Sequence, residues 1–183
     1  MAGVDPLTRL ADRAQAGDRR ALEAFVETSY DQVWRLCAAL VNRQSADDLA
    51  QESFTQAVRC LPRFRRESSA RTWLLAIARH VCFDELRGRS RRRGYHAPLD
   101  PSLEPVVIAA GEEVEVADLI GRLGADRREA FVLTQVLGLS YKEAARVCEC
   151  PIGTVRSRVA RARADLVELL NQKEPGHLRS SSA

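Results

Sequence analysis

The sequence predicts an all-α protein made of two small helical domains that an extended linker joins. Apolar residues recur at intervals of three and four over most of the chain, which is the period of one face of a helix. Aromatic residues make up only 5% of the chain and Gly residues number 10, so the core must come mainly from Leu, Val and Ala, a composition that favours helices over strands. A sharp change of composition near residue 94 separates the two helical parts.

The first domain is predicted over residues 19–93. Ser45 and Asp48 have the spacing of a capping box, so a helix should begin at Ser45. Pro62 should end that helix, because the residue before a proline avoids the helical conformation. Residues 63–70 have no apolar period and are predicted to form a loop. Three helices are expected in this domain: 19–41, 45–61 and 71 to about 87.

Residues 94–113 are predicted to form an acidic, extended linker. Six acids and no Lys or Arg lie between Gly94 and Gly121, and three prolines fall near the start of this stretch. Helical periodicity then resumes, and the second domain is predicted over 114–171. The tail 172–183 is polar and is predicted to be disordered.

The second domain carries further signals of helix ends. Asp126 with Glu129, and Ser140 with Glu143, have the spacing of capping boxes. Gly138 lies where the C-terminus of a helix favours a residue with positive φ. We therefore expect one helix to begin near each of the two capping boxes and one to end at Gly138.

The segment 139–166 has the layout of a helix-turn-helix. A short helix follows Ser140, a turn is expected at residues 148–150, and Pro151 should take the first position of a new helix, where its missing N–H needs no partner. Glu149 falls where such turns often have Gly, and a positive φ there would cost a glutamate about 1 kcal/mol.

The helix that follows Pro151 contains no acid up to Ala164 and is rich in arginine. An arginine-rich helix can simply be a surface helix whose charges face solvent and bind nothing. Here the turn, the proline and the one-sided charge occur together, which favours binding to DNA phosphates and to base edges in the major groove. The expected DNA-binding residues of this helix are Thr154, Arg156, Ser157, Arg158 and Arg161.

Two further charged features lie in the first domain. Acidic and amide side chains share one face of the predicted second helix: Asp47, Asp48, Gln51 and Glu52. This face either docks a basic protein surface or only complements the helix dipole, and the spacing alone favours the second. The loop and helix that follow combine basic, aromatic and hydroxyl side chains, a mixture that suits unstacked or single-stranded DNA.

Composition limits the other functions. The net charge of +3 does not by itself identify a nucleic-acid binder. The chain has no apolar run long enough to cross a membrane and no apolar segment typical of a secretory signal, so we expect no membrane insertion. Its five cysteines are odd in number and contain no C-x-x-C pair, which indicates a reduced, cytoplasmic protein with structural thiols, without a metal site or cofactor.

Four segments resemble the extracytoplasmic-function sigma factors of bacterial RNA polymerase. Asp48-Leu-Ala-Gln-Glu-Ser-Phe54 and Ala70-Arg-Thr-Trp-Leu-Leu-Ala-Ile-Ala-Arg79 look like parts of sigma region 2. Gly138-Leu-Ser-Tyr-Lys-Glu-Ala-Ala145 and Pro151-Ile-Gly-Thr-Val-Arg-Ser-Arg158 resemble sigma region 4. The order and spacing fit over residues 19–171, and the chain is similar to the actinobacterial group typified by mycobacterial sigma C.

The resemblance implies a subunit that binds core RNA polymerase and directs promoter-specific transcription initiation, with catalysis left to the polymerase. Its acidic face would dock the clamp helices of the largest polymerase subunit. The flap of the polymerase would be a further contact of the chain. The loop and third helix would bind the minus-ten element and flip a base from the stack. The residues implied for the minus-ten element are Arg65, Ser68, Arg71, Trp73, Arg79 and His80. The arginine-rich helix would read the minus-thirty-five element, and the acidic linker would run toward the RNA exit path.

Other interpretations make different predictions. A free-standing helix-turn-helix regulator would bind duplex DNA without polymerase, usually as a dimer, but would leave the acidic face and the basic loop unexplained. An enzyme is disfavoured, because the three histidines lie far apart and no phosphate-binding loop, nucleophile elbow or H-E-x-x-H motif occurs. Many sigma factors of this family are held by an anti-sigma factor, and no residue of this sequence decides whether this chain is.

Overall fold

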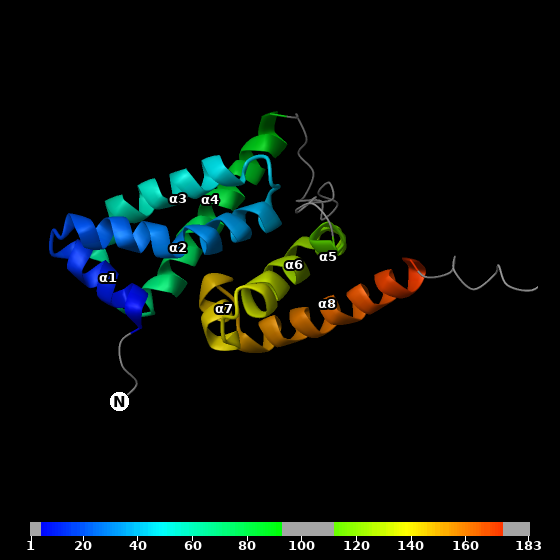
Figure 1. Cartoon of the computed structure of the whole chain (residues 1–183). Coiled ribbons are helices and arrows are strands. Elements are labelled where there is room, and N and C mark those ends of the chain that lie inside the picture. Colours follow the sequence, from blue (N-terminus) through cyan, green and yellow to red (C-terminus); the bar gives the residue numbers. More distant parts are fainter. Residues whose placement is uncertain (1–4, 93–111, 174–183) are drawn as a thin grey trace, which may run out of the picture.

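The computed structural model describes residues 5–92 and 112–173, and every regular element in these two ranges is a helix (Figure 1). Helices α1 to α4 form an N-terminal unit, and helices α5 to α8 form a C-terminal unit. The predicted all-α class is therefore confirmed. Most of the expected linker and of the expected tail lies outside the described residues.

The described chain opens with a helix that the sequence analysis did not predict, α1 (Pro6–Gln15). Asp5 caps it, since its Oδ1 accepts a hydrogen bond of 3.0 Å from the backbone N–H of Thr8. Pro6 occupies the first turn, where a missing N–H needs no partner. Leu7 and Ala11 are buried, and α1 packs mainly against α2 (Arg19–Leu40).

The three helices predicted for the first domain are confirmed as α2, α3 (Ala46–Cys60) and α4 (Ala70–Arg92). Helix α4 continues to Arg92 and so includes the arginine-rich stretch. A short 3-10 turn, η1 (Leu61–Arg63), precedes the irregular residues up to Ser69.

The capping box predicted at Ser45 is wrong. Ser45 has φ −96° and ψ −3° and makes no side-chain hydrogen bond to the start of α3. Its Oγ instead accepts a hydrogen bond of 2.6 Å from Arg89 of α4, and its N–H donates to Asn42 at 2.9 Å. The hydroxyl is thus directed to a distant helix, because an arginine donor is a stronger partner than a backbone N–H.

The C-terminal unit begins with α5 and ends with the long helix α8. Gly138 has φ +70°, as predicted. The capping box at Ser140 is confirmed: Ser140 Oγ accepts from the N–H of Glu143 at 3.3 Å, and Glu143 Oε2 accepts from the N–H of Ser140 at 2.9 Å. The elements are α5 (Glu112–Gly121), α6 (Ala125–Phe131), the π-turn η2 (Val132–Val136), α7 (Tyr141–Val147) and α8 (Ile152–Lys173).

The capping box predicted for Asp126 and Glu129 is wrong. Helix α6 follows Gly124, and no side chain caps it. Both acids lie inside the helix and have partners elsewhere in the fold. Asp126 accepts from Arg158 of α8 at 2.5 Å, and the buried Glu129 accepts from Arg79 of α4.

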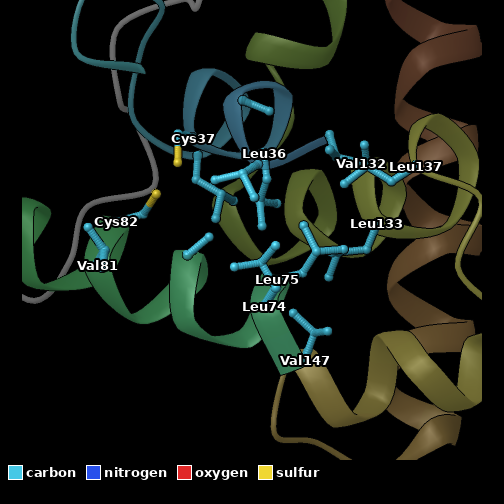
Figure 2. Close-up of a cluster of buried hydrophobic side chains, with 14 of the residues drawn as sticks. Leu36, Cys37, Leu74, Leu75, Val81, Cys82, Val132, Leu133, Leu137 and Val147 are labelled. Atoms are coloured by element: carbon cyan, nitrogen blue, oxygen red, sulfur yellow. The ribbon is translucent and has the colours of Figure 1, made fainter. Parts of the chain in front are cut away.

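One apolar core runs through both units (Figure 2). Leu36 of α2 and Leu74 and Leu75 of α4 lie beside Leu133 and Val147 of the C-terminal unit, and each is 1% exposed or less. Helix α4 consequently packs on α2 and α3 with one face and on α7 with another. Burial of these side chains holds the two units together in addition to their chain connection.

Candidate nucleic-acid interface

Helix α8 carries the residues predicted to read duplex DNA. Arg156, Ser157 and Arg161 are exposed along it, as expected for an outward face. Val155 and Val159 are buried on the opposite side, at 0% and 1% exposure, and fix the helix on the core of its unit. Guanidinium groups on such a face can bond phosphate oxygens or the acceptors of a guanine edge.

Two of the predicted residues of α8 are less open to solvent. Arg158 is half-buried, since its Nη2 lies 2.5 Å from Asp126 of α6 and its Nη1 lies 3.9 Å from the sulfur of Cys150. Thr154 is half-buried, and its carbonyl accepts a hydrogen bond of 2.9 Å from Ser157. The exposed cations of the predicted set are therefore Arg156 and Arg161.

The turn between α7 and α8 has the conformation considered from the sequence. Glu149 has φ +52°, in the left-handed region that favours glycine. Its carboxylate lies 2.9 Å from His80 Nε2 and 3.8 Å from Arg79 Nη1, both on α4. The strained turn thus places an acid of the C-terminal unit against two residues that the resemblance assigns to the minus-ten element. The prediction that Pro151 takes the first helical position is wrong by one residue: α8 begins at Ile152, and the carbonyl of the preceding Pro151 accepts a hydrogen bond of 2.9 Å from the N–H of Thr154.

The acidic face lies on α3, and Asp47, Asp48, Gln51 and Glu52 are all exposed. The Tyr30 hydroxyl donates to Asp47 at 3.0 Å. The Tyr30 ring stacks on Phe54, with ring centres 6.0 Å apart, so the first turn of α3 is fixed to α2. The four side chains form one surface of negative charge and amide groups that a basic partner can approach.

The residues expected to contact the minus-ten element divide into two groups. Arg65 is exposed and Ser68 half-buried in the loop between α3 and α4. Trp73 packs against Phe64, with ring centres 5.0 Å apart, so its ring contributes to the support of this loop. The other three predicted residues, Arg71, Arg79 and His80, contact the C-terminal unit.

Arg71 and Arg79 of α4 donate hydrogen bonds to residues of the C-terminal unit. Arg71 donates to the Leu137 carbonyl and, at 2.5 Å, to Gln32 Oε1. Arg79 donates to Glu129 and lies 4.6 Å above the centre of the Phe83 ring. Burial raises the pKa of Glu129, against the opposing charge of Arg79.

Sequence reasoning missed Arg128, a cation that is 1% exposed. It donates to the carbonyl oxygens of Gly121 at 2.7 Å, of Leu123 at 3.0 Å and of Ala39 at 3.4 Å. Desolvation lowers the pKa of this guanidinium. Arg128 therefore satisfies the C-terminal carbonyls of α5 and touches the end of α2. No local pattern in the sequence distinguishes it from the exposed arginines beside it.

Comparison with known proteins places these features in a family. Residues 25–92 match the family model for sigma-70 region 2, and residues 113–166 match that for sigma-70 region 4. The chain is 51% identical over 178 residues to the ECF RNA polymerase sigma factor SigC of Mycobacterium tuberculosis, and 95% of each chain is covered. The chain belongs to the extracytoplasmic-function sigma factors. It directs transcription initiation as a sigma factor, and the resemblance stated from the sequence is confirmed.

Other sigma factors of this family are more distant. The sigma-E factor of Haemophilus influenzae is 34% identical over 169 residues, which cover 84% of this chain and 89% of the relative. The structure of CnrH in complex with the cytosolic domain of CnrY is similar with a TM-score of 0.72 at 28% identity, over 92% of this chain and 99% of CnrH. The sigma factor RpoE of Bartonella quintana, in complex with the anti-sigma factor NepR, gives a TM-score of 0.69 at 28% identity over 81% of this chain and 96% of RpoE.

The thiols of this sigma factor lie mostly in its core. Cys37 and Cys82 are fully buried, and Figure 2 shows their sulfur atoms directed toward one another between α2 and α4. The neighbouring Cys37 thiol and burial raise the pKa of Cys82, and burial raises that of Cys148. Within residues 5–92 and 112–173, no group of His, Cys, Asp and Glu side chains could hold a metal ion. None of the helices in these ranges is long and apolar enough to cross a membrane.

Proposed function

We propose that this sigma factor binds core RNA polymerase through the acidic face of α3 and recognises two promoter elements. The loop 61–70 and α4 would bind and open the minus-ten element, and α8 would read the minus-thirty-five element. The observation that carries the proposal is the separation of charge. Three exposed acids, Asp47, Asp48 and Glu52, lie together in the first two turns of α3, whereas exposed arginines lie on α8, at Arg156 and Arg161, and in the loop, at Arg65. One surface therefore suits a basic protein, and the others suit DNA.

The acidic face is proposed to dock the clamp helices of the largest polymerase subunit, and region 4 to contact the flap. The stacking of Tyr30 on Phe54 supports this assignment, because it holds the helix that presents the acids in a fixed place. Asp48 is the residue we expect to matter most, since it is exposed and belongs to the motif shared with region 2. The chain would act in the cytoplasm, where bacterial polymerase meets the chromosome.

Contact of α4 with DNA would require a rearrangement. Arg71, Arg79 and His80 are bonded to residues of the C-terminal unit. These side chains could reach a promoter strand only after α4 has separated from α6 and α7. We therefore propose that promoter binding opens this interface. An anti-sigma factor is a further proposed partner, on the likeness to RpoE, which was solved with NepR.

A pull-down with purified core RNA polymerase, followed by run-off transcription on genomic fragments, tests the proposal. Wild-type chain should bind core and give discrete new transcripts. Asp48→Arg should lose core binding while its helical circular dichroism stays unchanged. Glu27→Arg, an equal change of charge at an exposed site of α2, serves as the control and should bind normally. Normal binding by Asp48→Arg would remove the docking assignment.

A further inference from the structure

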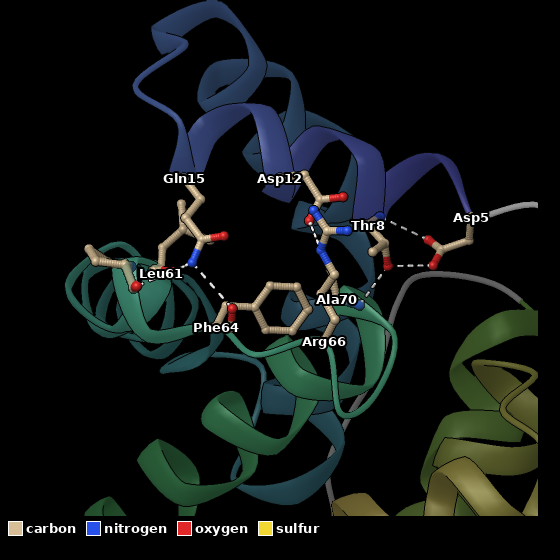
Figure 3. A network of polar contacts seen from close by, with 9 residues as sticks. Asp5, Thr8, Asp12, Gln15, Leu61, Phe64, Arg66 and Ala70 are labelled. Carbon is tan, nitrogen blue, oxygen red and sulfur yellow. Dashed lines mark hydrogen bonds and ion pairs between the residues drawn. The ribbon is translucent and has the colours of Figure 1, made fainter.

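Helix α1 carries three polar side chains on one face. Thr8, Asp12 and Gln15 stand at positions i, i+4 and i+7 of the helix. Figure 3 shows all three directed at the segment 61–70, which joins α3 to α4. The match to the region 2 family model begins only at residue 25, so α1 lies outside it.

Gln15 holds the start of this segment. Its Nε2 lies 3.1 Å from the carbonyl oxygen of Leu61, 3.2 Å from that of Pro62 and 3.2 Å from that of Phe64 (Figure 3). These carbonyls follow the last residue of α3, and that of Leu61 also accepts a hydrogen bond of 3.0 Å from the N–H of Phe64. The amide group of one side chain is thus hydrogen-bonded to three backbone carbonyls at the start of the segment 61–70.

Asp12 holds the middle of the segment. Arg66 has φ +58°, a conformation that is unfavourable for any residue with a Cβ atom. Its Nε lies 2.6 Å from Oδ1 of Asp12, a side chain that is only 19% exposed. The Arg66 side chain is 58% exposed, so the ion pair lies at the surface, and it joins the left-handed turn at Arg66 to α1.

Thr8 holds the end of the segment. Its hydroxyl accepts a hydrogen bond of 2.8 Å from the N–H of Ala70, the first residue of α4. The same hydroxyl donates to Asp5 at 2.5 Å, which fixes its orientation. The contacts run in antiparallel order along α1, so one helical face spans the loop from its start to its end.

We propose that α1 is a positioning element for minus-ten recognition, with Gln15 and Asp12 as the positioning residues. They fix the backbone of residues 61–70 so that Arg65 and Ser68 meet the promoter strand in a single arrangement. Contacts that are fixed before binding discriminate between bases better than contacts from a mobile loop. The inference rests on the proposed function of this loop.

The test uses the full chain assembled with core polymerase. Gln15→Glu removes both N–H donors and places a carboxylate against the carbonyls, whereas Gln15→Lys restores donors of similar reach. Arg9→Ala, at an exposed site of α1, is the control. Each holoenzyme transcribes a pool of templates in which the minus-ten segment of one promoter, found by run-off transcription, is randomised. Amide hydrogen exchange of residues 61–70 is followed in each free variant.

Gln15→Glu should lower the preference for the best minus-ten base by about fivefold, with faster exchange in the loop and an unchanged minus-thirty-five preference. Gln15→Lys and Arg9→Ala should keep the wild-type preference. Unchanged base preference or unchanged loop exchange in Gln15→Glu would overturn the positioning role.

Arg65→Ala distinguishes failure of the role of α1 from failure of the proposed function of the loop. If Arg65→Ala alters the minus-ten preference and Gln15→Glu does not, only the role of α1 fails. If Arg65→Ala has no effect either, the proposed function of the loop fails with it.

Discussion

Arg79 of α4 donates a hydrogen bond through Nε to the carboxylate of Glu129 on α6. The Glu129 side chain is 2% exposed and that of Arg79 is 16% exposed, so the pair is largely removed from water. It joins the two units of the sigma factor on α4, the helix that we propose binds the promoter.

Arg79→Ala should lower the free energy of unfolding by about 3 kcal/mol, because it leaves the buried Glu129 without its cation. Urea unfolding at neutral pH measures the change. Arg87→Ala on the same helix is the matched control, since Arg87 is exposed and pairs with Asp84 at 3.1 Å on the surface. The control should change stability by less than about 0.5 kcal/mol. Equal effects of the two substitutions would show that burial of the pair is unimportant.

Glu129 should make the stability of the protein depend on pH. Burial raises its pKa in the folded state above the ordinary value of 4.5, so folding favours the protonated form. The stability that this group contributes is fully present below pH 4.5 and is lost as the pH rises through the folded-state pKa. Glu129→Gln cannot titrate, so the variant should gain stability relative to wild type over that rise. Urea unfolding across a pH series measures the difference, and a constant difference would contradict the expectation.

The strain of the turn at Glu149 should appear as a difference in stability between the glycine and alanine variants of this residue. Its φ of +52° costs a residue with a Cβ atom about 1 kcal/mol, and glycine avoids this strain. Glu149→Ala is the control, because alanine loses the contacts to α4 but keeps the strain. In 1 M salt, which screens the exposed pair with His80, Glu149→Gly should be more stable than Glu149→Ala by about 1 kcal/mol. Equal stability of the two variants in thermal unfolding would show that the turn is unstrained.

Glu143 should stabilise the helix-turn-helix in its ionised form and lose this contribution in acid. Hydrogen bonds from Ser140 hold its pKa below the usual value of 4.5. The contribution is therefore present above pH 4.5 and is lost as the pH falls through the folded-state pKa. Glu143→Ala should reduce the free energy of unfolding by about 1 kcal/mol at pH 7 and by much less near pH 3. The exposed Lys142→Ala, measured in parallel, should show no such pH dependence.

Arg161 should contribute to promoter choice. If it reads a base, Arg161→Ala should weaken discrimination at one minus-thirty-five position by roughly 1–3 kcal/mol. Arg163→Ala is the comparison, since Arg163 donates to Gln135 of its own unit at 2.7 Å. Holoenzyme binding to single-base variants of the element measures both. A loss of affinity equal on all sequences would assign Arg161 to the phosphate backbone.

The sequence by itself determined the features that depend on neighbouring residues. Helical periodicity placed α2, α3 and α4, and the pairing of Ser140 with Glu143 correctly marked the start of α7. Gly138 and Glu149 were expected at turns, and both have positive φ. These predictions succeeded because the Ser140 capping box, the two turns and the one-sided burial of the helices each depend on residues a few positions apart in the chain.

Only the tertiary structure decided which partner each polar side chain takes. Ser45 has the spacing of a helix cap, yet its hydroxyl binds Arg89, which stands 44 positions along the chain. Glu129 likewise has the spacing of a capping residue, but it is buried against Arg79. Gln15 donates to carbonyls that follow α3, far along the chain. A polar group removed from water must bond to whatever donor or acceptor the packing brings near. That choice depends on the positions of whole helices, and these are fixed by the shared apolar core and not by local spacing.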